Sequence, residues 1–245
     1  MKRNDKYDGA ASVERAMVTL KDEAQAAHLS RFFKTGKGQY GEGDRFLGIK
    51  VPVTRQVVKE MWRDCTVEDV EVLLASPWHE MRLCALLILV RLFANARKDT
   101  ELRRRIADFY LAHTDKINNW DLVDLSCYEI LGVWLLDKDR TVLYALAENG
   151  KTIWEQRIGI VSTMQFIRHG QLDDTFAIAD ILLHHEHDLI HKAVGWLLRE
   201  TGKRDTARLE AFLAARYATM PRTMLRYAIE KFPEEKRSAF LNGRI

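Results

Sequence analysis

The segment NNWDLVD, residues Asn118 to Asp124, holds the side chains with the clearest chemical potential. Asn118 or Asn119 can cap a helix, and Asp121 then falls in the first turn, where the helix dipole favours an acid. Asp124 lies four residues after Trp120, on the same helix face, and is followed by a helix that is apolar on most sides. A carboxylate there costs desolvation energy unless a partner or a ligand offsets it. Asp124 is therefore either a salt-bridged structural residue or a functional carboxylate.

Two further tryptophans have neighbours that permit a structural or a binding role. Trp154 begins a helical segment with Arg157 one turn later, and an indole that supports a guanidinium is a common structural pair. Trp196 follows Gly195 in HKAVGWLLRE. A glycine at that point lets a neighbouring helix approach a buried tryptophan.

The histidine cluster does not predict a metal site. His185-Glu186 lacks the second histidine of a zinc-protease helix, and no third ligand accompanies His187 and His191. The glycine-rich segment 34–44, KTGKGQYGEGD, lacks the ending of a phosphate-binding loop and predicts a surface loop, with lysines that could touch a nucleic-acid backbone. We expect neither a metal nor a cofactor.

Composition predicts a soluble globular protein. Apolar residues make up 47% and charged residues 30% of 245 residues, with only four prolines. Three cysteines without a CxxC pair favour a reducing compartment. The polar amino terminus has no apolar segment typical of a signal peptide, and no apolar run is long enough to cross a bilayer. We therefore expect a cytoplasmic protein.

Helical periodicity runs nearly from end to end, with brief connections, and predicts an all-α fold in one domain, residues 1–245. The longest expected helices are 11–33, 77–95, 120–136 and 152–168. Comparable places near the start of alternate helices carry Arg82, Asp121, Arg157, Lys192 and Arg226, whose successive differences in number are 39, 36, 35 and 34. This is the length of a two-helix solenoid repeat such as HEAT.

Such an array would place these cations in a basic stripe along a concave groove, interrupted by one acid. The alternative is a set of independent surface cations at chance spacing. The net charge of +3 does not by itself indicate a nucleic-acid binder, so the distribution of the charge decides.

Several ordered motifs together carry a family resemblance. They are FFKTGKGQYGEGDRFLGIKVPVTRQVVK, NNWDLVD, IWEQRIGIV, KAVGWLLRE and PRTMLRYAIEKF. With them the chain resembles the AlkD-like DNA alkylation repair family over almost its whole length. The resemblance implies a HEAT-like superhelix and a monofunctional glycosylase that releases N3- and N7-alkylated purines. It implies a catalytic Asp124 and substrate-binding Trp120, Trp196 and Arg157. Some active members have a second tryptophan where this chain has Asn119.

The chemistry is consistent with a single carboxylate. Glycosidases usually need two acids, one of which protonates the leaving group. A purine alkylated at N3 or N7 already carries positive charge, so it can leave without a proton donor. Asp124 would stabilise the sugar cation, the two indoles would add cation–π attraction, and Arg157 would hold a phosphate. The remaining cations of the stripe are expected to bind the DNA backbone: Arg82, Lys192 and Arg226. The expected partner is double-stranded DNA, bound by a monomer.

Two other functions stay open on the same scaffold. A non-catalytic binder of distorted or branched DNA would keep the basic stripe but would not need Asp124. A protein-interaction scaffold, the usual role of HEAT arrays, would need neither a tryptophan-flanked carboxylate nor salt-dependent DNA binding.

Overall fold

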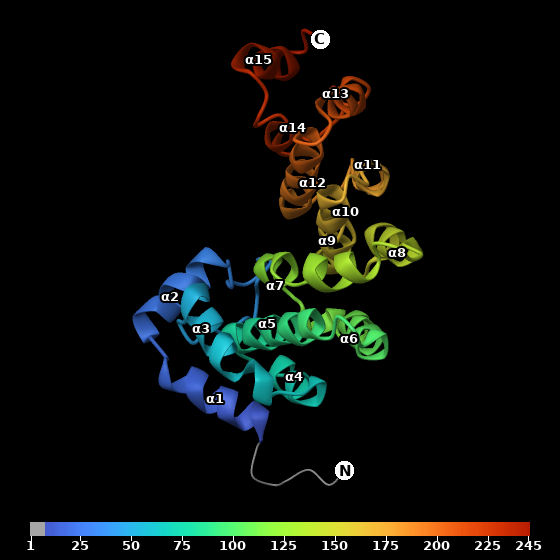
Figure 1. Cartoon of the computed structure of the whole chain (residues 1–245). Coiled ribbons are helices and arrows are strands. Elements are labelled where there is room, and N and C mark those ends of the chain that lie inside the picture. The colour runs from blue at the N-terminus through green and yellow to red at the C-terminus, as the bar shows by residue number, and fades with distance from the viewer. Residues whose placement is uncertain (1–7) are drawn as a thin grey trace. The chain divides into compact units, whose positions relative to one another are not determined.

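The computed structural model describes residues 8–245, and within that range every regular element is a helix (Figure 1). An isolated parallel bridge joins Arg45 to Trp78. The chain forms two compact units, Met1–Ser126 and Cys127–Ile245. Most of the polar amino terminus, expected to lack a signal peptide, lies outside the described residues. Within the described part, no helix is long and apolar enough to cross a membrane.

The first unit is built around one buried helix, α5 (His79–Asn95). Residues 81–89 are all buried, which is typical of a helix that is apolar all round. Helices α3, α4, α6 and α7 pack against it, and α1 packs on α3 and α4. The other helices of this unit are α1 (Gly9–Thr19), α2 (Glu23–Phe32), α3 (Val51–Met61), α4 (Val67–Leu74), α6 (Thr100–Ala112) and α7 (Trp120–Asp124).

The second unit is a two-row helical array. One row is α9 (Ile153–Val161), α12 (Asp188–Gly202) and α14 (Arg222–Ala228), in which α12 packs on both neighbours. The other row is α8 (Thr141–Asn149), α11 (Asp173–Ile181) and α13 (Thr206–Ala214), which pack against the first row (Figure 1). A π-helix (Tyr128–Gly132), α10 (Met164–Arg168) and α15 (Glu234–Asn242) complete the unit. The expected all-α, helical-repeat fold class is confirmed.

The repeat spacing corresponds to a real equivalence of position in this unit. Arg157, Lys192 and Arg226 are each the fifth residue of their helix, α9, α12 and α14 respectively. Gly195 shows how closely the row packs: a Cβ there would lie 2.5 Å from the carbonyl oxygen of Met224 and 2.5 Å from the Cβ of Tyr227. Gly195 thus lets α12 approach α14, as its place before Trp196 predicts.

Of the four longest expected helices, 77–95 is observed as α5, whereas each of the other three is interrupted by a polar side chain that bonds to the backbone. Helix 11–33 breaks where Asp22 caps α2 by accepting the amide of Gln25 at 2.9 Å. Helix 120–136 ends early, and Ser126 donates its hydroxyl to the carbonyl of Leu122. Helix 152–168 breaks where Thr163 donates to the carbonyl of Ile160 at 2.7 Å. Polar side chains of this kind compete with the hydrogen bonds of the helix backbone. A prediction from apolar periodicity alone does not include this competition.

Candidate functional site

The short helix α7 presents the motif residues selectively. Its three middle residues, Asp121 to Val123, are buried, whereas Trp120 and Asp124 are partly exposed. The two lie one turn apart, on one helix face. Asn119 is fully buried, and its side-chain oxygen accepts the backbone amide of Trp120 at 2.9 Å. Asn119 therefore acts inside the unit and does not reach the face that Trp120 and Asp124 share.

An aromatic stack fixes the Trp120 indole. Its ring lies on the ring of Phe33, with 5.4 Å between centroids and 19° between planes. Phe33 stacks in turn on Phe46 at 5.1 Å, and Phe46 stacks on the imidazole of His79 at 4.6 Å. Phe32, whose residue surface is 56% exposed, meets Trp120 edge to face at 6.2 Å. Packing of this kind restricts the indole to one orientation.

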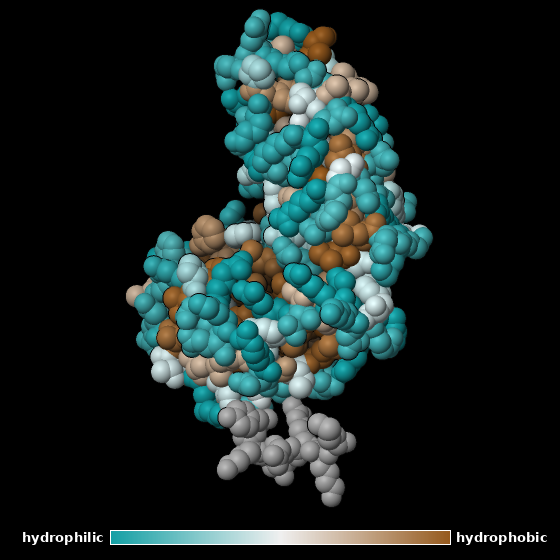
Figure 2. All heavy atoms as spheres, viewed as in Figure 1, coloured by the Kyte–Doolittle hydropathy of each residue, from teal (hydrophilic) through white to brown (hydrophobic). Residues whose placement is uncertain are grey.

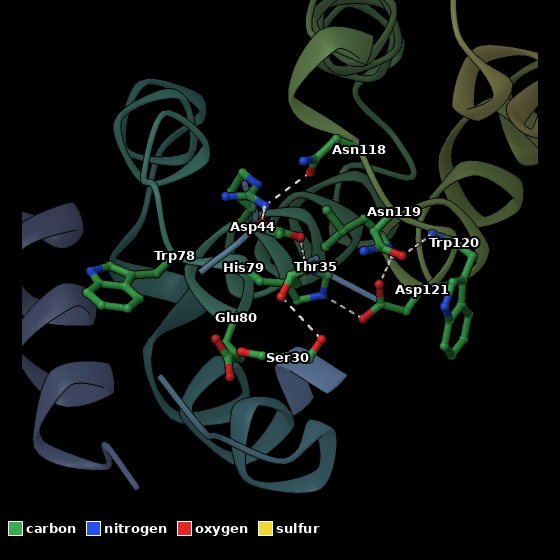
Figure 3. Close-up of polar contacts among 12 residues, drawn as sticks. Ser30, Thr35, Asp44, Trp78, His79, Glu80, Asn118, Asn119, Trp120 and Asp121 are labelled. Atoms are coloured by element: carbon green, nitrogen blue, oxygen red, sulfur yellow. Dashed lines mark hydrogen bonds and ion pairs between the residues drawn. The ribbon is translucent and has the colours of Figure 1, made fainter. Parts of the chain in front are cut away.

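Beneath this stack, His79 joins two carboxylates (Figure 3). Its Nδ1 lies 2.8 Å from Asp44 Oδ2, and its Nε2 lies 2.8 Å from Asp121 Oδ2. The side chains of His79 and Asp44 are no more than 2% exposed. Burial disfavours the charged imidazolium, but the charges and hydrogen bonds of Asp121 and Asp44 outweigh it and raise the pKa of His79 to about 9.

Arg82 belongs to the same network. Its Nη2 donates to Asp44 and, at 3.0 Å, to Asn118 Oδ1, and its Nη1 donates to the Ser76 carbonyl at 2.9 Å. Burial acts to raise the pKa of Asp44, but His79 and Arg82 together hold it below its usual value. Arg82 is only 6% exposed and therefore lies inside the unit. Its expected role in binding the DNA backbone stays a prediction.

The next residue of α5, Glu80, binds a turn of backbone. Its carboxylate accepts the amides of Leu47 at 2.8 Å, Gly48 at 2.8 Å and Ile49 at 3.1 Å. Gly48 has φ +91, and a Cβ there would lie 1.9 Å from the Asp22 carbonyl oxygen, so only glycine fits. The start of α5 thus anchors the segment that links α2 to α3.

Sequence reasoning missed this anchor, although a signal for it exists. In WHEMRLCALLILV the charged residues His79, Glu80 and Arg82 come directly before an apolar run that extends to Val90. Charges at the start of a helix whose next turns are apolar must themselves be close to buried, and buried charges need partners. GEGD in the preceding loop and WD in the later motif supply two of those partners, Asp44 and Asp121.

In the second unit the predicted site residues differ in exposure. Arg157 is 5% exposed and donates Nη1 to the carbonyl of Leu189, near the start of α12. Lys192 is partly exposed and pairs with Asp188 at 2.7 Å. Arg226 is exposed on α14. Lys192 and Arg226 are therefore the predicted backbone-binding residues that the structure leaves accessible.

Trp196 lines a cavity of about 530 Å³ between α10 and α12. Three cationic side chains and one acidic side chain share this wall with two apolar residues: Arg168, Lys203, Arg204, Glu200, Met164 and Ile167. Lys203 pairs with Glu200 at 2.7 Å. An indole beside an excess of positive charge is a combination that suits stacking on a base and contact with a phosphate.

The histidine cluster serves local structure. His185 Nε2 lies 3.0 Å from Gln156 Oε1, and His187 Nδ1 accepts the amide of Leu189 at 3.1 Å. Over residues 8–245, no group of three or more His, Cys, Asp or Glu side chains is arranged to hold a metal ion.

Comparison with known proteins decides the family. The model of the family described as "DNA alkylation repair enzyme" matches residues 13–232. This chain belongs to the DNA alkylation repair family. Among solved structures, a predicted DNA alkylation repair enzyme from Enterococcus faecalis is similar, with a TM-score of 0.68 and 17% identity over 87% of this chain and 97% of that one. At 17% identity, the similarity to this solved structure shows that the two chains share a fold. The comparison with curated proteins gave no match.

Proposed function

We propose that this member of the DNA alkylation repair family is a DNA glycosylase for cationic N3- and N7-alkylated purines in duplex DNA. The observation that carries the proposal is the pair of partly exposed residues on α7: an indole held in an aromatic stack and a carboxylate one turn away. The other three residues of this helix are buried, so the helix offers these two groups to a ligand. Family membership supports DNA as that ligand.

The reaction needs no proton donor. As the bond between C1′ and the purine nitrogen breaks, its electron pair neutralises the cationic base, and positive charge moves to the sugar. Asp124 stabilises that sugar cation and orients the water whose oxygen bonds to C1′, while the water's proton passes to solvent. Fixed groups aimed at developing charge are the largest single contribution in many enzymes. Trp120 adds cation–π attraction, on the order of 1–2 kcal/mol when desolvated.

Contacts to the DNA backbone are assigned to the exposed cations of the second unit, Lys192 and Arg226. Trp196, beside its cationic cavity, is a second residue able to stack on DNA. Arg157, which is interior, supports the start of α12 through Leu189. We propose that the protein works as a monomer, in the cytoplasm and without a cofactor.

The test compares wild-type protein with Asp124→Asn and with Asp108→Asn, the same exchange at an exposed acid of α6. Each is incubated in excess over a duplex that carries 7-methylguanine, and the released base and the bound DNA are measured. We expect Asp124→Asn to bind the duplex normally and to release base at least about 100-fold more slowly. Asp108→Asn should match wild type.

Two results would contradict the assignment. Release of the base by Asp124→Asn at the wild-type rate would show that Asp124 takes no part in the reaction. Tight binding by wild type without any release would instead favour a non-catalytic binder of distorted DNA.

A further inference from the structure

His79 occupies the centre of a buried chain of charges in the first unit. Both ring nitrogens face carboxylate oxygens, Asp44 on one side and Asp121 on the other, each at 2.8 Å. A neutral imidazole carries one N–H and would turn a lone pair toward one of the two carboxylates. Only the doubly protonated ring donates to both. Arg82 balances the second negative charge by its bond to Asp44, so the cluster is neutral when His79 is charged.

The two carboxylates belong to segments that flank the Trp120 site. Asp121 follows Trp120 directly in α7, and Asp44 ends the glycine-rich loop. A helix of five residues is too short to hold its own geometry in water, so contacts from outside must orient it. The bond from His79 to Asp121 is such a contact, and it reaches α7 within its first turn.

The same imidazole also supports the aromatic stack. Its ring lies on Phe46, which carries Phe33 and, through it, the Trp120 indole. His79 is therefore connected to Trp120 in two ways. One is its hydrogen bond to Asp121 of α7, and the other is the stack of Phe46 and Phe33. The side chain is 2% exposed, so it cannot itself touch a substrate.

We propose that the imidazolium of His79 is a positioning group that fixes α7 through Asp121 and thereby sets the orientation of Trp120 and Asp124. The inference rests on the proposed function for the part that concerns base release, but the coupling between His79 and Trp120 stands apart from it. The groups that face the imidazole are Asp44 from the loop, Asp121 from α7 and the rings of Phe33 and Phe46, with Arg82 one bond beyond.

The first measurement needs no substitution at His79. Tryptophans are replaced by 5-fluorotryptophan, and the ¹⁹F resonance of Trp120 is assigned by its loss in Trp120→Phe. We expect this resonance in the wild-type fold to shift as pH rises through about 9, where His79 loses its proton. A Trp120 resonance that stays constant from pH 7 to pH 10 would overturn the proposal, whether or not the protein releases any base.

The second measurement uses His79→Gln, whose donors sit on one nitrogen and whose other end is an acceptor, so it cannot donate from both ends as the imidazolium does. His113→Gln, at the partly exposed end of α6, is the matched control. His79→Gln should release 7-methylguanine about tenfold or more slowly at pH 7.5 with unchanged affinity for the duplex, and its Trp120 resonance should not titrate near pH 9. Release at the wild-type rate by folded His79→Gln would refute the positioning role. Absence of release by wild type would refute the proposed function alone, since the ¹⁹F titration still reports on His79.

Discussion

At the level of single residues, some charged side chains form a buried network and others lie at the surface. Asp44, His79 and Arg82 are buried, whereas Asp124 and Arg226 are at least partly exposed. The sequence predicts that Asp124 is a functional acid, and the structure leaves this residue partly exposed. It also suggests that Asp121 is no more than a favourable first-turn acid, whereas Asp121 is buried against His79. A hydrogen bond between residues 42 positions apart leaves no trace in local spacing, so pattern analysis has no means to find it.

The raised pKa of His79 makes stability depend on pH. The folded protein holds the proton more tightly than the unfolded chain, so the stabilisation is full below pH 6.5 and is lost as pH rises through about 9. We expect the free energy of unfolding of wild type to fall over this window by on the order of 2–3 kcal/mol more than that of His79→Gln. Urea denaturation at a series of pH values measures this difference. Parallel curves for the two proteins would show that the histidine is neutral in the fold.

At the scale of elements, the start of α5 organises the first unit. His79, Glu80 and Arg82 bind the loop before α3, and the same helix supports α7. Periodicity predicts α5 within two residues at its start and correctly at its end, because a long apolar run leaves little choice. It fails at α7 and α9, where Ser126 and Thr163 bond to backbone carbonyls and stop the helix.

Close approach of α12 and α14 gives a prediction at this scale. Alanine normally stabilises a helix relative to glycine by about 0.5–1 kcal/mol. At Gly195, however, the added Cβ would meet backbone and Cβ atoms of α14 at 2.5 Å, which forces the helices apart. We expect Gly195→Ala to lower the free energy of unfolding by about 1–3 kcal/mol, measured by thermal or urea unfolding. Ala177→Ser, at an exposed position of α11, should stay within about 0.5 kcal/mol of wild type. A stabilised Gly195→Ala would mean that the two helices are not in contact there.

At the scale of the whole molecule, sequence alone predicts the helical-repeat class well. The repeat length of about 35 residues is set by two helices and their turns, and in the second unit it places Arg157, Lys192 and Arg226 at the same rank of α9, α12 and α14. The pattern does not tell which of these cations is exposed. Arg157 is buried, whereas Lys192 and Arg226 are accessible, because burial depends on how neighbouring repeats pack.

Accessible cations predict a salt-dependent affinity for DNA. Each phosphate contact releases counterions, so the double variant Lys192→Glu, Arg226→Glu should weaken duplex binding and flatten the slope of log K against log salt by about two. Arg208→Glu, on α13 in the opposite row, makes the same kind of charge change and should have little effect. Fluorescence anisotropy with a labelled duplex at several salt concentrations measures both. An unchanged slope in the double variant would show that Lys192 and Arg226 do not contact the DNA backbone.

The proposed reaction needs only one carboxylate, because the departing base is already cationic. Single-turnover release from two duplexes that differ only in the lesion, 7-methylguanine or the neutral base uracil, tests it most directly. We expect release of 7-methylguanine well above the spontaneous rate and no release of uracil. Equal release of both bases, or no release of 7-methylguanine above the spontaneous rate, would contradict it.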